Sequence, residues 1–163
     1  MSMYRIENQG FDYQELDLEI DDIIDQFPDY MSTLYIHDFS KNNLALTPYW
    51  KPVATGFSEI NGNENLLPDI TYWIGGTLVL SPVAYRYLGE LIRPHGEFLP
   101  VHIDGQTYYI FNCLETINSL TGVTPLSKPI VKNQNEISEN LYCNAHFKSA
   151  IEEFDLKGIS FCH

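Results

Sequence analysis

The middle of the chain shows the clearest pattern of apolar and polar positions. Residues Thr77–Leu80 form a largely apolar run, which is typical of a buried strand. Ser81 and Pro82 follow, and this pair favours a helix start, because serine caps free N–H groups and proline has none to satisfy. Apolar residues then recur every three or four positions, so the sequence predicts an amphipathic helix over about 82–93.

A hairpin pattern follows this helix. Residues 98–103 and 106–114 both have the composition of strands, and Asp104-Gly105 stands between them. This dipeptide is favoured in two-residue hairpin turns, because both positions need a positive φ. The sequence therefore predicts that the two strands are adjacent and antiparallel.

The C-terminal part has the same kinds of signal. Residues 141–143 are strand-like, and Asn144 is a good cap for a helix that the apolar spacing predicts over about 145–155. Gly158 lies just beyond the end of this helix, and residues 159–161 are apolar enough for a last short strand.

The first forty residues combine apolar periodicity with many acids. Residues 3–6 suggest a strand, and the alternation over 16–20 suggests another one that is half buried. The spacing over 20–27 favours a short helix, and we expect a further strand at 33–36. If the apolar residues face a core, the acids between them must project into solvent.

The elements follow one another without a regular strand–helix–strand rhythm. Residues 40–77 are rich in turn-forming residues, with strand-like pieces near 52–60 whose pairing the sequence does not indicate. The pattern favours an α+β fold with mixed and antiparallel sheet elements over a doubly wound parallel sheet. With 163 residues, we expect a single domain over 1–163 with an acidic portion at 1–40.

Charge changes the picture most. The chain has 22 acidic against 9 basic residues, a net charge of −13, and residues 1–40 hold ten acids and one base. Such a molecule repels phosphate backbones and anionic lipids, which argues against nucleic-acid and membrane partners. The N-terminus lacks the apolar stretch of a signal peptide, and three widely spaced cysteines are no disulfide framework. We therefore expect a cytoplasmic protein.

The acidic portion allows two interpretations. It is either a solvated face that keeps the protein soluble or a docking surface for a basic partner, whose association it would accelerate. Tyrosines in the same portion suit an interface as well as a core. The candidate partner-binding residues are Asp12, Glu15, Asp17, Asp21, Asp22, Asp25 and Asp29.

Residues for metal binding or nucleophilic catalysis form no strong pattern. Two Cys/His pairs could supply zinc ligands, but adjacent residues of a strand point apart, so we expect no metal and no cofactor. Cys113 could pair with one of two histidines, yet it lies in an apolar strand where burial makes a thiol inert. The candidate zinc-ligand pairs are Cys143 with His146 and Cys162 with His163, and the candidate catalytic pair is Cys113 with His95 or His102.

Six short stretches of the chain match the pattern of a known family. They are Asp69–Trp73 (DITYW), Leu78–Ser81 (LVLS), Gly96–Pro100 (GEFLP), Tyr108–Asn112 (YYIFN), Phe147–Glu152 (FKSAIE) and Leu156–Phe161 (LKGISF). Together they resemble a bacterial immunity-protein family that is encoded beside polymorphic toxins, over about residues 66–161. The resemblance implies a non-enzymatic protein that binds and neutralises a cognate toxin domain.

The matched positions include eight residues that we interpret as structural anchors. At Gly96 we expect a turn with positive φ, and at Asn112 a hydrogen bond to a loop backbone. We expect Glu97 to pair with Arg93 or to cap a backbone N–H. The anchors are Trp73, Ser81, Gly96, Glu97, Pro100, Asn112, Gly158 and Phe161.

An alternative hypothesis belongs to a different functional class. The chain could be an enzyme or a small-molecule-binding domain with a pocket near Trp73 and the 96–112 hairpin. A concave pocket with convergent polar groups would favour this alternative, whereas an acidic surface with exposed aromatic residues would favour the inhibitor.

Overall fold

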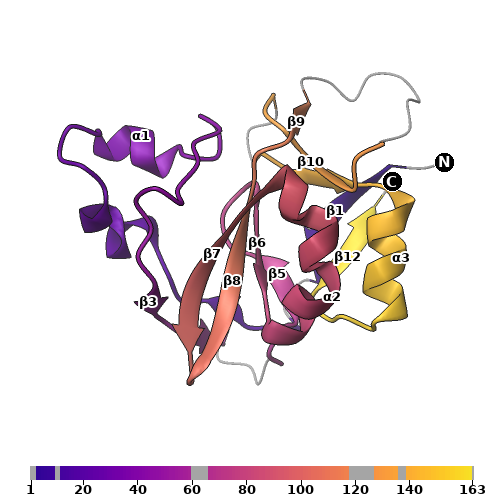
Figure 1. Cartoon of the computed structure of the whole chain (residues 1–163). Helices are drawn as coiled ribbons and strands as arrows, with labels where there is room; N and C mark the ends of the chain where they lie inside the picture. Colours follow the sequence, from indigo (N-terminus) through magenta and orange to yellow (C-terminus); the bar gives the residue numbers. More distant parts are fainter. Residues whose placement is uncertain (1–2, 10–11, 60–65, 118–126, 136–138, 163) are drawn as a thin grey trace.

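A computed structural model of the chain describes residues 3–9, 12–59, 66–117, 127–135 and 139–162 (Figure 1). The fold is mixed α+β, as the sequence predicts. Its central sheet has the strand order β3-β7-β8-β6-β5, and every pair is antiparallel except β3 with β7. The strands are β3 (Val53–Ala54), β5 (Ile70–Tyr72), β6 (Thr77–Leu80), β7 (Gly96–Ile103) and β8 (Gln106–Cys113).

A second sheet brings the two ends of the chain together. Its order is β12-β1-β11-β10-β9, so the first strand lies between two strands from the C-terminal part. Only β9 and β10 pair in parallel among its described strands. The strands are β1 (Tyr4–Asn8), β9 (Thr116–Ile117), β10 (Ile130–Asn133), β11 (Leu141–Cys143) and β12 (Ile159–Cys162).

One hydrophobic core lies between the two sheets and two helices. Helix α2 (Pro82–Ile92) and helix α3 (Ala145–Glu153) lie on the side of the central sheet that faces this core (Figure 1). Leu80 and Phe111 of the central sheet pack there with Leu88 of α2, Phe147 of α3 and Ile6 of the second sheet, and all five are almost fully buried.

The N-terminal layer, residues 12–50, covers the opposite face of the central sheet, to the left of β7 and β8 in Figure 1. It supplies Ile23 and Phe39 to a second core, where they pack with Val101 and Ile110 of the sheet. Its elements are β2 (Glu15–Leu16), which pairs with β4 (Phe57–Ser58), two 3₁₀ turns, η1 (Ile20–Asp22) and η2 (Ile24–Gln26), and helix α1 (Thr33–His37).

Local sequence signals located most of the strong elements. The side chain of Ser81 accepts a hydrogen bond from the N–H of Ala84, and that of Asn144 accepts one from Phe147, so both predicted caps are confirmed. The predicted hairpin is also confirmed, with β7 and β8 antiparallel along their whole length. Its turn residue Asp104 has φ 50°, and the following glycine has φ 77°.

The prediction of a strand at 33–36 was wrong, because these residues lie in helix α1. Ser32 caps this helix by accepting a hydrogen bond from the N–H of Tyr35. The short apolar run contains β-branched residues, so it also suits a strand, and the cap decides between the two structures. Of the strand predicted over 16–20, only Leu16 lies in a strand, β2. The short helix predicted over 20–27 is instead two 3₁₀ turns, η1 and η2. Helix α3 ends two residues before the predicted boundary.

The predicted positive φ at Gly96 was also wrong. This residue has φ −179°, which is extended backbone. A side chain is excluded for another reason: a Cβ built here would lie 2.3 Å from the carbonyl oxygen of Asn112 and 2.7 Å from the ring of Phe111. The glycine thus permits the close approach of β7 to β8.

No helix within the described ranges is long and apolar enough to cross a membrane.

A Gly96→Ala substitution should lower the free energy of unfolding by about 1–3 kcal/mol, because the new methyl group has no space in the closely packed sheet. Gly56→Ala is the matched control, since a Cβ there meets no atom within 4 Å and its φ is not positive. The control should leave stability unchanged or raise it by up to about 1 kcal/mol. Urea denaturation followed by circular dichroism measures both, and equal stabilities would contradict the steric argument.

Candidate functional site

All seven candidate partner-binding acids are exposed on the outside of the N-terminal layer. They alternate with residues that face the second core: Leu16 and Leu18 flank Asp17, and Ile20 and Ile23 flank the next pair of acids. The outward projection of the carboxylates is therefore confirmed. The seven are Asp12, Glu15, Asp17, Asp21, Asp22, Asp25 and Asp29.

Most of these carboxylates have no cation beside them. The Oδ1 atom of Asp21 lies 3.0 Å from Nε2 of His37, and Oδ2 of Asp22 accepts a hydrogen bond of 2.8 Å from the N–H of Glu19. Within the described ranges, none of the other five forms an ion pair with a basic side chain. The layer thus presents negative charge that the chain itself leaves largely uncompensated.

Large exposed apolar residues accompany the acids on this layer. We call Tyr30, Leu34 and Tyr35 the α1 patch, and 83%, 72% and 42% of their respective surfaces are exposed. A cavity of about 460 Å³ opens at the same place. It is lined by Tyr30, Met31, Ser32, Tyr35, Leu44 and Tyr49.

Five further exposed apolar residues lie on α2, just after α3 and in the segment before β5. We call Leu66, Leu67, Val83, Tyr87 and Phe154 the α2 patch. The rings of Tyr87 and Phe154 are stacked with their centroids 4.0 Å apart. Together, the α1 patch and the α2 patch contain all the large hydrophobic residues that are exposed in the described parts of the chain.

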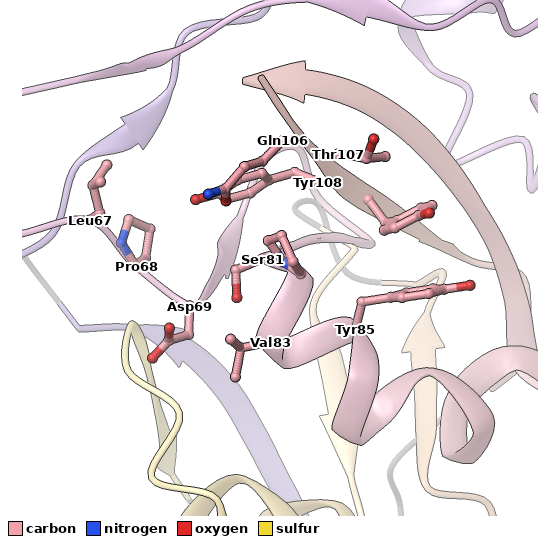
Figure 2. Close-up of a pocket in the computed structure, with 11 residues that line it drawn as sticks. Leu67, Pro68, Asp69, Ser81, Val83, Tyr85, Gln106, Thr107 and Tyr108 are labelled. Carbon is pink, nitrogen blue, oxygen red and sulfur yellow. The ribbon is translucent and has the colours of Figure 1, made fainter. Parts of the chain in front are cut away.

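A pocket of about 680 Å³ adjoins the α2 patch (Figure 2). It lies between the start of α2, the first half of β8 and the segment before β5, and Figure 2 shows Tyr85 extending from the helix on the side away from Leu67 and Asp69. Its polar groups already serve the fold: Ser81 caps α2, and Oδ2 of Asp69 accepts a hydrogen bond from the N–H of Lys157. Burial, and then nearby Asp69, raise the pKa of Tyr108 in its wall.

The pocket expected near Trp73 and the hairpin is not one site. Residues Gln106–Tyr109 of the hairpin line the pocket beside α2, whereas Trp73 borders a separate cavity of about 330 Å³ with residues of β1. The indole N–H of Trp73 donates a hydrogen bond of 2.6 Å to the carbonyl of Leu18, which ties the N-terminal layer to the central sheet.

Glu97 and Asn112 form a clamp between the central sheet and the loop that follows α1. They are register partners on β7 and β8, and the amide of Asn112 donates to Oε2 of Glu97 at 2.8 Å. The same carboxylate accepts the backbone N–H groups of Leu46 and Thr47, and the amide of Asn112 also donates to the carbonyl of Leu44. Capping by Glu97 and loop bonding by Asn112 are therefore confirmed.

The expected pairing of Glu97 with Arg93 is not present. The guanidinium of Arg93 instead donates to the hydroxyl of Tyr85 and lies 3.7 Å from the carboxylate of Glu90. The reason is geometric: Glu97 faces the N-terminal layer, whereas Arg93 lies over Tyr85 and Phe98 on the other side of the sheet.

The remaining anchors also serve the fold. The carbonyl of Pro100 accepts a hydrogen bond from the indole of Trp50, and the ring of Phe161 packs edge-on against Tyr4 and Phe147. Gly158 has φ 129°, and a Cβ there would lie 1.9 Å from a backbone carbonyl of β5. These contacts explain the anchor positions without any role in chemistry.

The cysteines form no catalytic or metal-binding constellation in the described ranges. Burial raises the pKa of the Cys113 thiol to about 12, as expected for an inert core residue. His95 lies 3.2 Å from the carboxylate of Glu115, and His102 pairs with Thr107 at the far end of the hairpin. All three cysteines are free, and no group of three or more potential ligands gathers among the described side chains; His163 lies outside them.

The buried Lys132 was not found by sequence analysis. It lies on β10, fully buried, and its Nζ donates a hydrogen bond of 2.7 Å to the carbonyl of Ser40. Burial lowers the pKa of this amine. The apolar neighbours in the IVKN stretch were the available signal, but a lysine in a short strand is normally exposed.

No protein-family model matches the sequence, and the comparison with curated proteins finds no match.

The clamp predicts a large effect for Glu97→Ala. The substitution would leave the N–H groups of Leu46 and Thr47 without their acceptor and would remove one of the two acceptors of the Asn112 amide. We expect the free energy of unfolding to fall by about 2–3 kcal/mol, measured by urea denaturation. Glu90→Ala removes only an exposed pair with Arg93 and should cost less than about 1 kcal/mol. Equal effects would mean that the clamp adds little stability.

The lowered pKa of the buried Lys132 predicts that the free energy of unfolding depends on pH. Its folded-state pKa lies below the ordinary 10.5, so between these two values the unfolded chain binds more protons than the folded chain. The stability of the wild type, relative to Lys132→Met, should therefore rise as the pH increases toward 10.5. Urea denaturation of both proteins at neutral and at alkaline pH measures this difference. Parallel pH profiles would contradict the lowered pKa.

Proposed function

We propose that this chain is a non-enzymatic immunity protein of the cytoplasm, which binds and neutralises a cognate toxin domain with a basic surface. The observation that supports this proposal most is the outside of the N-terminal layer, where seven carboxylates and the α1 patch are exposed together. The resemblance of residues 66–161 to an immunity-protein family supplies the class of partner. Toxin domains that act on nucleic acid need a basic surface, which such a layer complements.

The N-terminal layer is suited to binding because its inner face is fixed to the central sheet. Its inner face packs on the central sheet through residues such as Ile23, Phe27 and Ile36. The Glu97 clamp and the Trp73 indole add hydrogen bonds across the same interface. A rigid surface loses less conformational entropy when it binds than a flexible acidic tail would, and this favours tight association.

The pocket beside α2 supports a second candidate function, the binding of a small molecule. Its volume of about 680 Å³ falls in the range of ligand sites, and its walls are largely aromatic and apolar. However, Ser81 and Asp69 already form hydrogen bonds within the fold. We therefore rank this function below toxin binding.

The test of the proposal reverses charge on the N-terminal layer. A variant with lysine at Asp17, Asp21, Asp22 and Asp25 should associate with the toxin domain encoded by the neighbouring gene at least about tenfold more slowly at low salt. The difference should shrink at high salt, because ions screen attraction over about 8 Å at physiological strength. Stopped-flow fluorescence measures the association rate.

The matched control places lysine at four exposed acids of the other side of the molecule, Glu90, Glu152, Glu153 and Asp155, and so changes the net charge equally. If the control slows association as much as the test variant, overall charge rather than the layer attracts the toxin. Unchanged kinetics in a folded test variant would make the layer a solubilising surface only, and would direct the search to the loops of residues 40–77.

A further inference from the structure

The cavity of the α1 patch is built from aromatic walls. Tyr30, Tyr35 and Tyr49 line it together with Met31 and Leu44, and its volume is about 460 Å³. The side chain of Tyr30 is 83% exposed, so one wall is open to a partner. A hollow of this size is large enough to hold a protruding side chain of another protein.

The floor of this cavity is fixed to the central sheet. The ring of Tyr49 packs on Phe27 with the centroids 5.4 Å apart. Leu44 donates its N–H to the carbonyl of Phe39, and its own carbonyl accepts the amide of Asn112 in the clamp. The floor formed by Tyr49 and Leu44 is therefore positioned before any partner arrives, which lowers the entropic cost of binding.

The negative charge near the cavity favours a cationic side chain as its occupant. Residues 19–39 contain six acids and no lysine or arginine. Asp29 directly precedes Tyr30 and is exposed, and Asp38 is exposed at the end of α1. This field repels an anionic side chain and attracts a cationic one, while the aromatic faces favour a planar and weakly hydrated cation.

The chain itself shows the same kind of contact elsewhere. The guanidinium of Arg93 lies 5.7 Å from the ring centroid of Tyr85 and 5.3 Å from that of Phe98. An arginine from a partner would meet the rings of Tyr30 and Tyr35 in the lining of this cavity, with the exposed Asp29 next to Tyr30 in the sequence.

We propose that the α1 cavity is a subsite for one arginine side chain on the basic surface of the toxin. This inference rests on the proposed function of the N-terminal layer and adds the residue type that it recognises. The carboxylates accelerate the encounter over long range, whereas the tyrosines hold the guanidinium once the two proteins touch.

The first experiment needs no toxin. The full chain is titrated with N-acetyl-arginine methylamide, and the tyrosine ring signals are followed by NMR. N-acetyl-citrulline methylamide is the control probe, because it has nearly the same shape without the charge. We expect the arginine probe to shift the signals of Tyr30, Tyr35 and Tyr49, and the citrulline probe to bind roughly tenfold more weakly. Equal binding of both probes, or shifts elsewhere only, would overturn the subsite.

The double variant Tyr30→Ala with Tyr35→Ala should abolish binding of the arginine probe. Tyr87→Ala, which removes an exposed ring of the α2 patch, should leave it unchanged. Circular dichroism checks that the variants fold, as expected for residues that belong to neither hydrophobic core. Retained probe binding in the double variant would place the arginine elsewhere and overturn the inference.

Titration with the toxin separates this inference from the proposed function. The double variant should raise the dissociation rate by roughly tenfold and leave the salt dependence of association unchanged, because the tyrosines have no charge. If the double variant loses probe binding but keeps wild-type toxin affinity, the subsite is wrong while the proposed function stands. If no variant of the layer affects the toxin, the proposed function itself fails.

Discussion

Strand β8 places Ile110 in one hydrophobic core and the next residue, Phe111, in the other, and both side chains are fully buried. The central sheet must therefore be covered on both faces, by α2 and the second sheet on one side and by the N-terminal layer on the other. Neither cover is dispensable, because removing one would expose a whole apolar sheet face to water. The acidic surface thus belongs to a segment that the fold requires.

The need to cover both faces of the central sheet explains how a surface with many acids can stay ordered. The acids of the N-terminal layer repel one another, and this repulsion opposes the compact state. Burial of Ile20, Ile23 and Phe27 against the central sheet offsets it, and the Glu97 clamp adds directional hydrogen bonds. A docking surface of this kind can be highly charged outside only because its inner face is strongly apolar.

Sequence patterns predicted those elements of the fold that depend on interactions between residues close together in the chain. Ser81 and Asn144 cap their helices with bonds to residues three positions away, so the sequence around them suffices. The loop partners of Glu97 and the partner of Lys132 lie 50 or more positions away, and no periodicity reveals such pairing. For the candidate site, alternation predicted that the acids face solvent, but the α1 cavity depends on residues 30–49 folding back together.

Strand β1 can complete its pairing only after β11 and β12 have been synthesised. Residues 5–8 pair with β12, which leaves the ribosome long after β1, whereas the central sheet is complete once β8 has emerged. Translation thus separates two assembly events: the acidic layer can dock on its sheet early, while β1 must wait for β11 and β12. Contacts so distant in sequence close slowly, so we expect the second sheet to form after the central sheet.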